Sequence, residues 1–322
     1  MENIISSKRA FITGVNGQDG ILLSKLLLAK GYEVAGAGSQ TFKSLSLDSN
    51  VGYTQIDICQ TEKIMKIVNE FRPNEFYNLA SISSVSRSFE EPERTWDVNS
   101  RAVDALLLRL FQSKLSRNLR FFQACSSEMF GLSTIEPQTE NVPFHPVSPY
   151  AESKVAAMKS CIAFRGKGFF VSCGIMYNHE SIYRPKKFVT RKITSGVAEI
   201  KQGCLSKIQI GNIYAERDWG YAGDYVEAMW LMLQSNQPDD FVIATGLTHS
   251  VRDILSIAFD EAGLLGRELE FLELNPNLLR SREINRLVGD FSKIRQNLGW
   301  FPRKDFETLI REMVAYDISM IN

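Results

Sequence analysis

The chain has 322 residues, 44% of them hydrophobic, and its 37 basic side chains balance 37 acidic ones. This composition suffices for one large domain, or two closely associated domains, with a buried core. A nucleic-acid-binding protein usually carries an excess or a stripe of basic residues, which this sequence lacks. We therefore expect no nucleic-acid partner, and at most local basic patches for a phosphorylated small molecule.

The five cysteines include no Cys-x-x-Cys pair, and the three histidines are far apart in the chain. This pattern is typical of reduced thiols in a cytoplasmic protein and predicts no metal site. The first residues contain no basic stretch followed by an apolar run, so we expect no signal peptide. No apolar run approaches the ~20 residues of a membrane span. The sequence predicts a soluble, cytoplasmic protein with no membrane partner.

Residues 1–176 alternate between short apolar strands and amphipathic helices. The predicted strands are 9–13, 32–37, 53–58, 75–80, 119–125 and 168–176, and the predicted helices are 21–30, 61–71, 92–113 and 150–165. Strands that alternate with helices are typical of a doubly wound, parallel α/β sheet. We predict a Rossmann-like dinucleotide-binding domain over residues 1–176.

The alternation is less regular after residue 176. Helices are predicted at 189–202, 224–234, 250–262 and 305–320, and strands at 207–211 and 241–244. We interpret 177–206 and 247–322 as a smaller C-terminal substrate-binding domain, with a segment of about 207–246 returning to the first domain. Ligands of doubly wound folds bind at the carboxyl ends of the strands, so this domain would form a lid over a substrate.

A glycine-rich turn joins the first predicted strand to the first predicted helix, with Gly14, Gly17 and Gly20 at a spacing of three. Glycines permit a tight turn and let backbone N–H groups approach a pyrophosphate at the N-terminus of the helix. Its place between a strand and a helix predicts that this turn binds a dinucleotide.

The residue that would hold the adenosine ribose belongs ~20 positions after the turn and is usually acidic for NAD, with an arginine nearby for NADP. Ser39 and Gln40 stand there, so the sequence leaves NAD and NADP both open. Asp57, at the end of its predicted strand, fits either an adenine contact or an ordinary turn.

Tyr150 and Lys154 share one face of a predicted helix, because they are four residues apart. A cation one turn away favours the phenolate, so we expect Lys154 to lower the pKa of Tyr150 from its usual ~10. Ser126 and Glu128 follow a predicted strand; in an extended chain both would face the cleft beside Tyr150. An exposed Tyr–Lys pair and a serine-rich turn are the structural alternatives. Together these residues predict hydride transfer assisted by an additional carboxylate base.

Basic residues are frequent in the second half of the chain. Any single one is usually a solvated surface charge, but arginines gathered around a lid would suit a diphosphate. They are Arg184, Lys186, Lys187, Arg191, Lys192, Arg217, Arg252, Arg280, Arg282 and Arg286.

With these motifs, the chain resembles the GDP-mannose 4,6-dehydratases, a family of extended short-chain dehydrogenases/reductases, over nearly its whole length. The resemblance rests on 13–20 (TGVNGQDG), 77–80 (YNLA), 126–131 (SSEMFG), 148–150 (SPY), 178–181 (NHES), 188–192 (FVTRK), 217–220 (RDWG) and 223–230 (GDYVEAMW). It implies a lyase of deoxysugar biosynthesis that removes water from GDP-mannose or a close GDP-sugar, with NADP or NAD as cofactor, in a homodimer or homotetramer.

The resemblance also implies roles for individual residues. The catalytic set would be Ser126, Glu128, Tyr150 and Lys154. The cofactor would contact Gly14, Asn16, Gly17, Gln18, Asp19, Gly20, Ser39, Asp57, Ile58, Leu79, Ala80, Tyr150, Lys154, Asn178 and His179. The GDP-sugar would contact Ser81, Ser127, Glu128, Asn178, Val189, Lys192, Arg217, Arg280 and Glu283, with the arginines on the diphosphate and Glu283 on the guanosine ribose.

The chain departs from the family's pattern in four places that bear on specificity. Ser39 and Gln40 replace a usual Arg-Arg pair, and 151–153 and 182–185 differ near the catalytic tyrosine and in the substrate loop. Arg280-Ser281 stands in place of an Arg-Pro pair near the nucleotide. NAD versus NADP, dimer versus tetramer and the identity of the sugar and base therefore stay open. A dehydratase for a GDP-heptose or a GDP-amino sugar, a 4-ketosugar reductase or epimerase, and a catalytically silent nucleotide-binding protein are the alternatives.

Overall fold

A computed structural model describes residues 7–41, 44, 46–278, 284 and 286–321. Its centre is a seven-stranded sheet with the order β10-β6-β5-β4-β1-β2-β3, and all its pairings are parallel. The strands are β1 (Arg9–Thr13), β2 (Glu33–Gly38), β3 (Gly52–Gln55), β4 (Glu75–Asn78), β5 (Arg120–Ser126), β6 (Val171–Met176) and β10 (Asp240–Ile243). This order confirms the predicted doubly wound, Rossmann-like α/β fold. It reverses between β1 and β4, where ligands of such folds bind.

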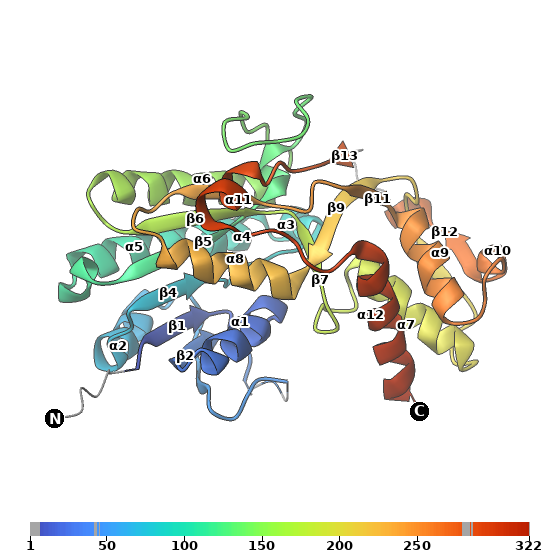
Figure 1. Cartoon of the computed structure of the whole chain (residues 1–322), viewed down its shortest axis with the longest axis horizontal. Coiled ribbons are helices and arrows are strands. Elements are labelled where there is room, and N and C mark those ends of the chain that lie inside the picture. Colours follow the sequence, from blue (N-terminus) through green and yellow to red (C-terminus); the bar gives the residue numbers. More distant parts are fainter. Residues whose placement is uncertain (1–6, 42–43, 45, 279–283, 285, 322) are drawn as a thin grey trace.

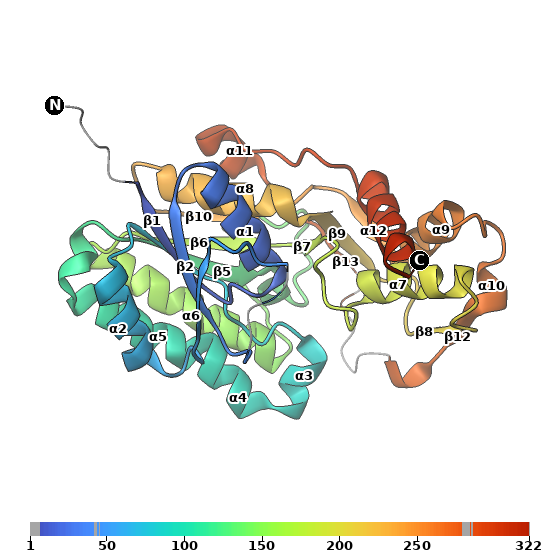
Figure 2. The same ribbon diagram turned by 90° about the horizontal axis from the view of Figure 1, so that it is seen from below.

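Helices cover both faces of this sheet (Figures 1 and 2). One face carries α1 (Gln18–Ala29), α8 (Ala222–Gln234) and α11 (Ser292–Leu298). The other face carries α2 (Thr61–Phe71), α5 (Ala102–Gln112) and α6 (Pro149–Gly166). The short helices α3 (Val85–Glu90) and α4 (Pro92–Trp96) lie between α2 and α5 in the chain. Two apolar clusters, one on each face, form the core of this domain.

The long helix predicted over 92–113 is interrupted, which corrects that prediction. A π-helical turn, Asp97–Arg101, separates α4 from α5. The turn contains Asn99, whose side chain accepts hydrogen bonds from the Ser81 hydroxyl (3.0 Å) and the Ile82 amide (2.9 Å). The widened turn therefore coincides with the residue that anchors the chain after β4, as π-turns often do near functional sites.

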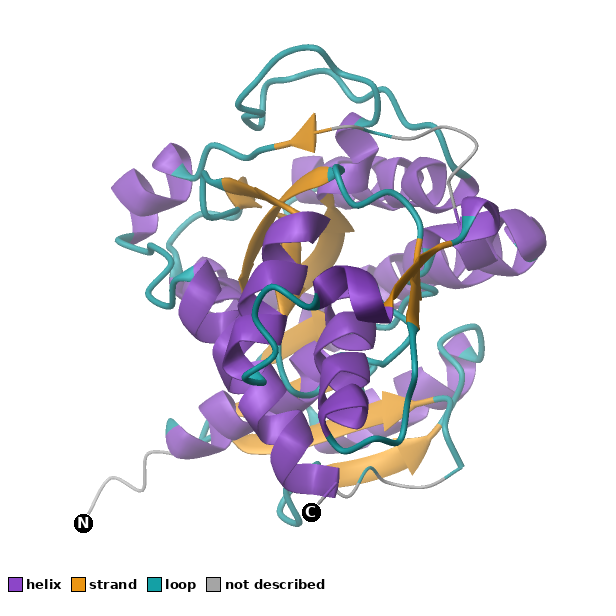
Figure 3. Cartoon of the chain, turned by 90° about the vertical axis from the view of Figure 1, so that its right-hand side faces the viewer, coloured by secondary structure: helices purple, strands orange, loops and turns teal. Residues whose placement is uncertain are grey.

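The smaller domain lies beside the carboxyl ends of the sheet and is seen end-on in Figure 3. Its helices α7 (Val189–Lys201), α9 (Val251–Glu261) and α12 (Phe306–Ile321) enclose a third apolar cluster. Its remaining elements are β7 (Asn178–Glu180), β8 (Ile208–Ile210), β9 (Glu216–Tyr221), β11 (Thr248–Ser250), α10 (Glu268–Phe271), β12 (Leu272–Leu274) and β13 (Arg286–Leu287).

The packing divides the chain differently from the predicted return at about 207–246. β8 and Trp219 of β9 contribute to the third cluster. In contrast, β10 is a strand of the large sheet, and α8 packs on one face of it. Ile294 and Trp300 also pack on the large sheet, so the chain returns to it a second time. The domain boundaries stay a prediction, and this packing favours a division at the start of α8.

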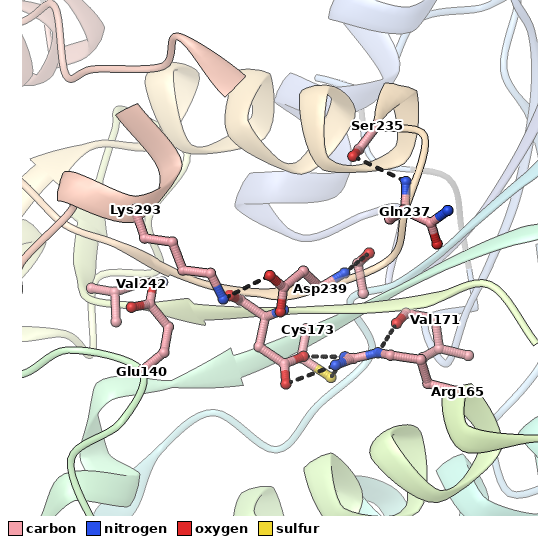
Figure 4. Close-up of polar contacts among 11 residues, drawn as sticks. Glu140, Arg165, Val171, Cys173, Ser235, Gln237, Asp239, Val242 and Lys293 are labelled. Carbon is pink, nitrogen blue, oxygen red and sulfur yellow. Dashed lines mark hydrogen bonds and ion pairs between the residues drawn. The ribbon is translucent and has the colours of Figure 1, made fainter. Parts of the chain in front are cut away.

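The edge strand β10 is surrounded by polar side chains (Figure 4). Arg165 of α6 forms an ion pair with the Asp240 carboxylate, and Lys293 of α11 donates to the Asp240 carbonyl (2.8 Å). Glu140 accepts the N–H of Val242 (2.7 Å), and Asp239 accepts the N–H of Asp240 (2.8 Å). These contacts satisfy backbone groups that an edge strand would otherwise leave unpaired. Within the described ranges, no helix is long and apolar enough to cross a bilayer.

Candidate active site

A cavity of about 1180 Å³ extends from the carboxyl ends of β1 to β6 into the smaller domain. Its walls come from both domains: Thr13 and Ser126 belong to the sheet, and Val189 and Lys192 belong to α7. A pocket for one small molecule usually measures roughly 300–1,000 Å³. The volume therefore exceeds that of an ordinary pocket for one small molecule.

The glycine turn forms one end of the cavity, and its backbone geometry requires glycine. Gly14 has a φ of 72°, and a Cβ there would lie 2.9 Å from the Ala80 nitrogen. A Cβ on Gly20 would lie 2.5 Å from the Cα of Val15. The turn is therefore packed against the chain after β4 and leads into the N-terminus of α1. An exposed helix N-terminus beneath a glycine turn fits a pyrophosphate group.

The other residues predicted for the cofactor line the same end. Ser39, Asp57, Ile58, Leu79 and Ala80 follow β2, β3 and β4, and each lies on the cavity wall. The structure thus brings together these side chains from three neighbouring strands at the switch point of the sheet.

Asp57 has two partners, one of which the sequence did not reveal. Its side chain accepts the Cys59 amide (2.9 Å), as in an ordinary turn, and also pairs with Arg94 of α4. Burial alone would raise the pKa of Asp57, but the Cys59 hydrogen bond and the Arg94 charge hold it below its ordinary value. Arg94 itself lines the cavity. Only the position of α4 beside the end of β3 reveals it.

The start of α1 is tied to β7 by a polar cluster. Gln18 donates to the His179 carbonyl (3.0 Å) and accepts from Ser181 (2.9 Å). Nε2 of His179 lies 3.0 Å from Asp19, and its Nδ1 lies 2.7 Å from the Tyr177 carbonyl. Both partners are acceptors, so both contacts are hydrogen bonds only when the ring is protonated. Burial would lower the pKa of His179, but Asp19 outweighs it and raises the value.

The four predicted catalytic residues meet at the centre of the cavity. Ser126 ends β5, Glu128 follows it, and Tyr150 and Lys154 lie one turn apart on α6. Lys154 donates to the Ala124 carbonyl (2.9 Å), and the Ser126 hydroxyl acts to lower the pKa of Tyr150. All four are at least nine-tenths buried. The arrangement can support proton transfer beside a carboxylate.

The chain after β5 does not stay extended, contrary to our expectation. It forms a 3₁₀ turn, Ser127–Phe130, in which the Ser126 hydroxyl accepts the Glu128 amide (3.3 Å). Ser126 and Glu128 nevertheless both line the cavity. Ser127, predicted to contact the substrate, is 1% exposed and is turned into the protein interior.

The expected lowering of the Tyr150 pKa is wrong for this structure. Burial raises the pKa of Tyr150 to about 12, and the hydrogen bond from Ser126 offsets this only in part. Burial also lowers the pKa of Lys154 to about 8. The Lys154 ammonium lies 5.8 Å from the centre of the Tyr150 ring and is bonded to a backbone carbonyl instead. Burial of both groups therefore outweighs their attraction.

Most residues predicted to contact the substrate, within the described part of the chain, also line the cavity. They are Ser81, Glu128, Asn178, Val189, Lys192 and Arg217. Arg280, Arg282 and Glu283 lie outside the described residues. Arg217, 6% exposed, donates to the Glu216 carbonyl (2.8 Å).

The basic run in the substrate loop separates into different roles. Arg184 pairs with Glu180 (3.2 Å), lies 3.7 Å from the centre of the Phe188 ring and lines the cavity. Its charge lowers the pKa values of both Tyr150 and Asp19. Arg191 instead forms a buried ion pair with Asp317 of α12, away from the cavity. Among the residues with described positions, no group of three or more His, Cys, Asp or Glu side chains is placed to hold a metal ion.

The matching family model and similar relatives indicate one family. The family model described as GDP-mannose 4,6 dehydratase matches residues 11–313. GDP-mannose 4,6 dehydratase 2 of Arabidopsis thaliana is 42% identical over 97% of this chain and 87% of its own length. GDP-mannose 4,6 dehydratase of Homo sapiens is 39% identical over 97% and 92%, respectively.

Solved structures share the fold at lower identity. The UDP-glucose 4-epimerase of Thermotoga maritima, with UDP-glucose, has a TM-score of 0.87 at 21% identity and covers 98% of this chain and 100% of its own. The dTDP-glucose 4,6-dehydratase DesIV of Streptomyces venezuelae, with NAD and TYD bound, has a TM-score of 0.84 at 21% identity, with 96% of each chain covered.

Proposed function

Because the chain belongs to the GDP-mannose 4,6-dehydratase family, we propose that it is a GDP-sugar 4,6-dehydratase, with GDP-mannose as the first candidate substrate. The observation that carries the proposal is the position of Glu128, which lines the same cavity as Ser126, Tyr150 and Lys154. A plain ketosugar reductase needs the tyrosine and lysine but no further carboxylate base. A dehydratase needs a base for the proton at C5.

We propose NADP or NAD as the resident cofactor, and the geometry of the glycine turn supports this choice. Gly14, Gly17 and Gly20 would hold the pyrophosphate, while Ser39 and Asp57 would face the adenosine. When bound, the nicotinamide would take a hydride from C4 of the sugar and return it to C6, so the cycle needs no external reductant.

The chain's own residues would move the protons. Tyr150 accepts the proton of the 4-hydroxyl as C4 is oxidised, while Ser126 hydrogen-bonds the 4-oxygen. The new ketone acidifies the C5 proton, which Glu128 removes. Glu128 then delivers this proton to the departing 6-hydroxyl, which leaves as water. When the hydride returns to C6, C5 takes up one proton, which balances the proton that Tyr150 accepted from the 4-hydroxyl. Arg184 and Lys154 contribute the positive charge that a Tyr150 phenolate requires.

The arrangement of the cavity supports a nucleotide-sugar orientation. Lys192 and Arg217 would hold the diphosphate at the end opposite the glycine turn, and Asn178 and Ser81 would face the sugar. We further propose that the protein is cytoplasmic and forms a homodimer or homotetramer. Light scattering on the purified protein would test the assembly.

The first experiment is incubation of the purified protein with GDP-mannose, without added reductant, followed by mass spectrometry. Loss of one water with no net change in cofactor redox state is the expected result. Net oxidation of NADPH or NADH without loss of water would instead indicate a reductase, and a C4 epimer of unchanged mass would indicate an epimerase. If GDP-mannose is unchanged, GDP-heptose and GDP-amino sugars are the next substrates to compare.

A further inference from the structure

A row of buried polar side chains crosses the sheet beneath the cavity. Thr13, Asn78 and Gln123 are each 1% exposed and lie on the adjacent strands β1, β4 and β5. The strand registers place Thr13 opposite Asn78, and Asn78 opposite Gln123. Three buried polar side chains in register at the centre of the sheet are costly unless they satisfy one another.

These side chains form a chain of hydrogen bonds with one direction. The Ala80 amide donates to the Thr13 hydroxyl (3.3 Å), which donates to the Asn78 side-chain oxygen (2.6 Å). The Asn78 amide donates to the Gln123 oxygen (2.8 Å), and the Gln123 amide donates to the Ala124 carbonyl (3.0 Å). Such chains strengthen each bond in a low-dielectric interior.

The chain of hydrogen bonds ends at the acceptor of Lys154. Ala124 lies one residue past the last β4–β5 pair, which is Asn78 with Gln123. Its carbonyl oxygen receives the Gln123 amide and, at 2.9 Å, the Lys154 ammonium. A carbonyl has two lone pairs, so these two donors occupy it fully.

We infer that Gln123 is a positioning residue for Lys154: its amide, held by Asn78 and Thr13, fixes the Ala124 carbonyl to which the Lys154 ammonium binds. This inference rests on the proposed function, in which Lys154 supports Tyr150, and on the predicted contact of Lys154 with the cofactor. The same chain begins at Ala80, on the dinucleotide end of the cavity. It therefore links the dinucleotide loop to the catalytic helix.

Removal of the Gln123 amide would act on the protonation of Lys154. In Gln123→Met the side chain keeps its length, but the Asn78 amide loses its acceptor and the Ala124 peptide loses one of its two donors. A less firmly oriented carbonyl stabilises the buried ammonium less well. Lys154 should then lose its proton at lower pH than in the wild-type protein.

The experiment measures binding rather than turnover. NADH and NADPH are titrated into the full-length protein by fluorescence from about pH 6 to about pH 10, the range in which a buried lysine titrates. Wild-type affinity should fall as Lys154 loses its proton. In Gln123→Met this fall should occur at least roughly half a pH unit lower, a ~3-fold loss of proton affinity.

Gln138→Met is the matched control. Gln138 is also a buried glutamine, and it bonds Ile135, Tyr177 and Val288 outside the chain of hydrogen bonds. It should lower Tm to a similar degree without moving the pH dependence of binding. If the pH dependence of dinucleotide binding does not change in Gln123→Met, or shifts equally in Gln138→Met, the inference is wrong but the proposed function still stands. A wild-type protein that binds neither dinucleotide would overturn the proposed function and this inference with it.

A second pair of variants keeps the test decisive if Gln123→Met does not fold. Thr13→Val keeps the shape of the side chain and removes the hydroxyl, whereas Thr13→Ser keeps the hydroxyl. Only Thr13→Val should shift the pH dependence of dinucleotide binding to lower pH. The same dependence in both variants would show that the hydroxyl has no such role.

Discussion

Burial acts in opposite directions on the two titratable side chains of α6 that line the cavity. It raises the pKa of Tyr150 to about 12 and lowers the pKa of Lys154 to about 8. The pair can hold its protons in two ways: as a tyrosinate beside a lysine ammonium, or as a neutral tyrosine beside a neutral lysine. Both states carry the same number of protons, and the charged state is the less populated one. The two groups titrate together, so a measured apparent pKa belongs to the pair.

We expect oxidation of the sugar at C4 to become faster as pH rises and to level off near pH 8, where the pKa of Lys154 lies. Below this pH the pair holds one proton too many for Tyr150 to accept another. Above it, the share of pairs in which Tyr150 has lost the proton stays constant. Stopped-flow absorbance of the reduced nicotinamide against pH measures this rate. If Lys154→Met shows the same rise of the oxidation rate with pH, the rise does not come from the Tyr150–Lys154 pair.

Glu128→Gln should separate the two halves of the reaction. The amide keeps the size of the side chain but cannot remove a proton, so loss of water should slow by at least ~100-fold while oxidation at C4 persists. Mass spectrometry of a single turnover, together with nicotinamide absorbance, distinguishes the two steps. Tyr150→Phe is the control, in which both steps should be lost. Full dehydratase turnover in Glu128→Gln would show that Glu128 is not the base.

Most of the site residues predicted from the sequence line the cavity, because they lie in motifs at the ends of predicted strands. It could not distinguish Arg184 from Arg191 within one basic run, since only the fold places Asp317 beside Arg191. Arg94 was missed for the same reason, because α4 brings it to Asp57 from a distant part of the chain. Their roles in catalysis and binding stay predictions.

At the scale of the elements, the start of α1 and the strand β7 are held together by side chains. Gln18 and Asp19 of α1 bond the backbone and ring of His179. The side chains of Asp19 and His179 are 21% and 10% exposed, so solvent screens their ion pair only in part. This contact fixes the glycine turn relative to the segment that leads to the substrate loop.

Asp19→Asn should destabilise the protein most in mildly acidic solution. The pKa of His179 is raised above 6.5, so its contribution is complete below about pH 6.5 and is lost as pH rises through the raised value. The pKa of Asp19 is lowered below 3.8, so its contribution is lost only in stronger acid. We expect a loss of about 1.5–3 kcal/mol in the free energy of unfolding near pH 6. Urea unfolding of the wild-type protein and Asp19→Asn at this pH, and again above the pKa of His179, measures the loss at each pH. An equal loss at both pH values would contradict a contribution from the ion pair.

Local pattern predicted the elements that carry their own signal. The strand at 9–13 and the helix at 61–71 have the predicted bounds, because each has a regular apolar pattern. β7, β9 and β13 are short strands that exist only because distant segments pair in the smaller domain. β7 and β13, with three and two residues, are too short to show a periodicity. The break at Asp97–Arg101 likewise depends on the tertiary contacts of Asn99.

At the scale of the whole molecule, the cavity is shared by the two domains. Residues of β1, β5 and α6 form one wall, and residues of α7 and β9 form the other. A ligand that contacts both walls stabilises the folded state of both domains at once. The increase in Tm that a ligand causes therefore reports how well the ligand fits the wall formed by α7 and β9.

GDP should raise Tm more than UDP or dTDP at the same concentration. A ligand at 100 times its Kd stabilises the folded state by about 2.7 kcal/mol, and one below its Kd by little. Thermal unfolding followed by circular dichroism, with each nucleoside diphosphate in turn, measures the preference. Arg217→Met should reduce the shift for all three if Arg217 holds the diphosphate. Equal shifts with the wild-type protein would argue against a GDP-sugar substrate.

The polar surroundings of β10 have a consequence for how copies of this chain can meet. The Ile243 carbonyl accepts a hydrogen bond from the Tyr177 amide, toward the sheet. Backbone groups point to opposite sides at successive residues of a strand, so the N–H and C=O groups of Asp240 and Val242 point away from the sheet. The outward N–H and C=O of Asp240 and the N–H of Val242 are already bonded to Asp239, Lys293 and Glu140. An incoming strand would have to break all three contacts before it could add to the sheet. This edge is therefore a poor template for strand-by-strand polymerisation, and we expect self-association to proceed through other surfaces.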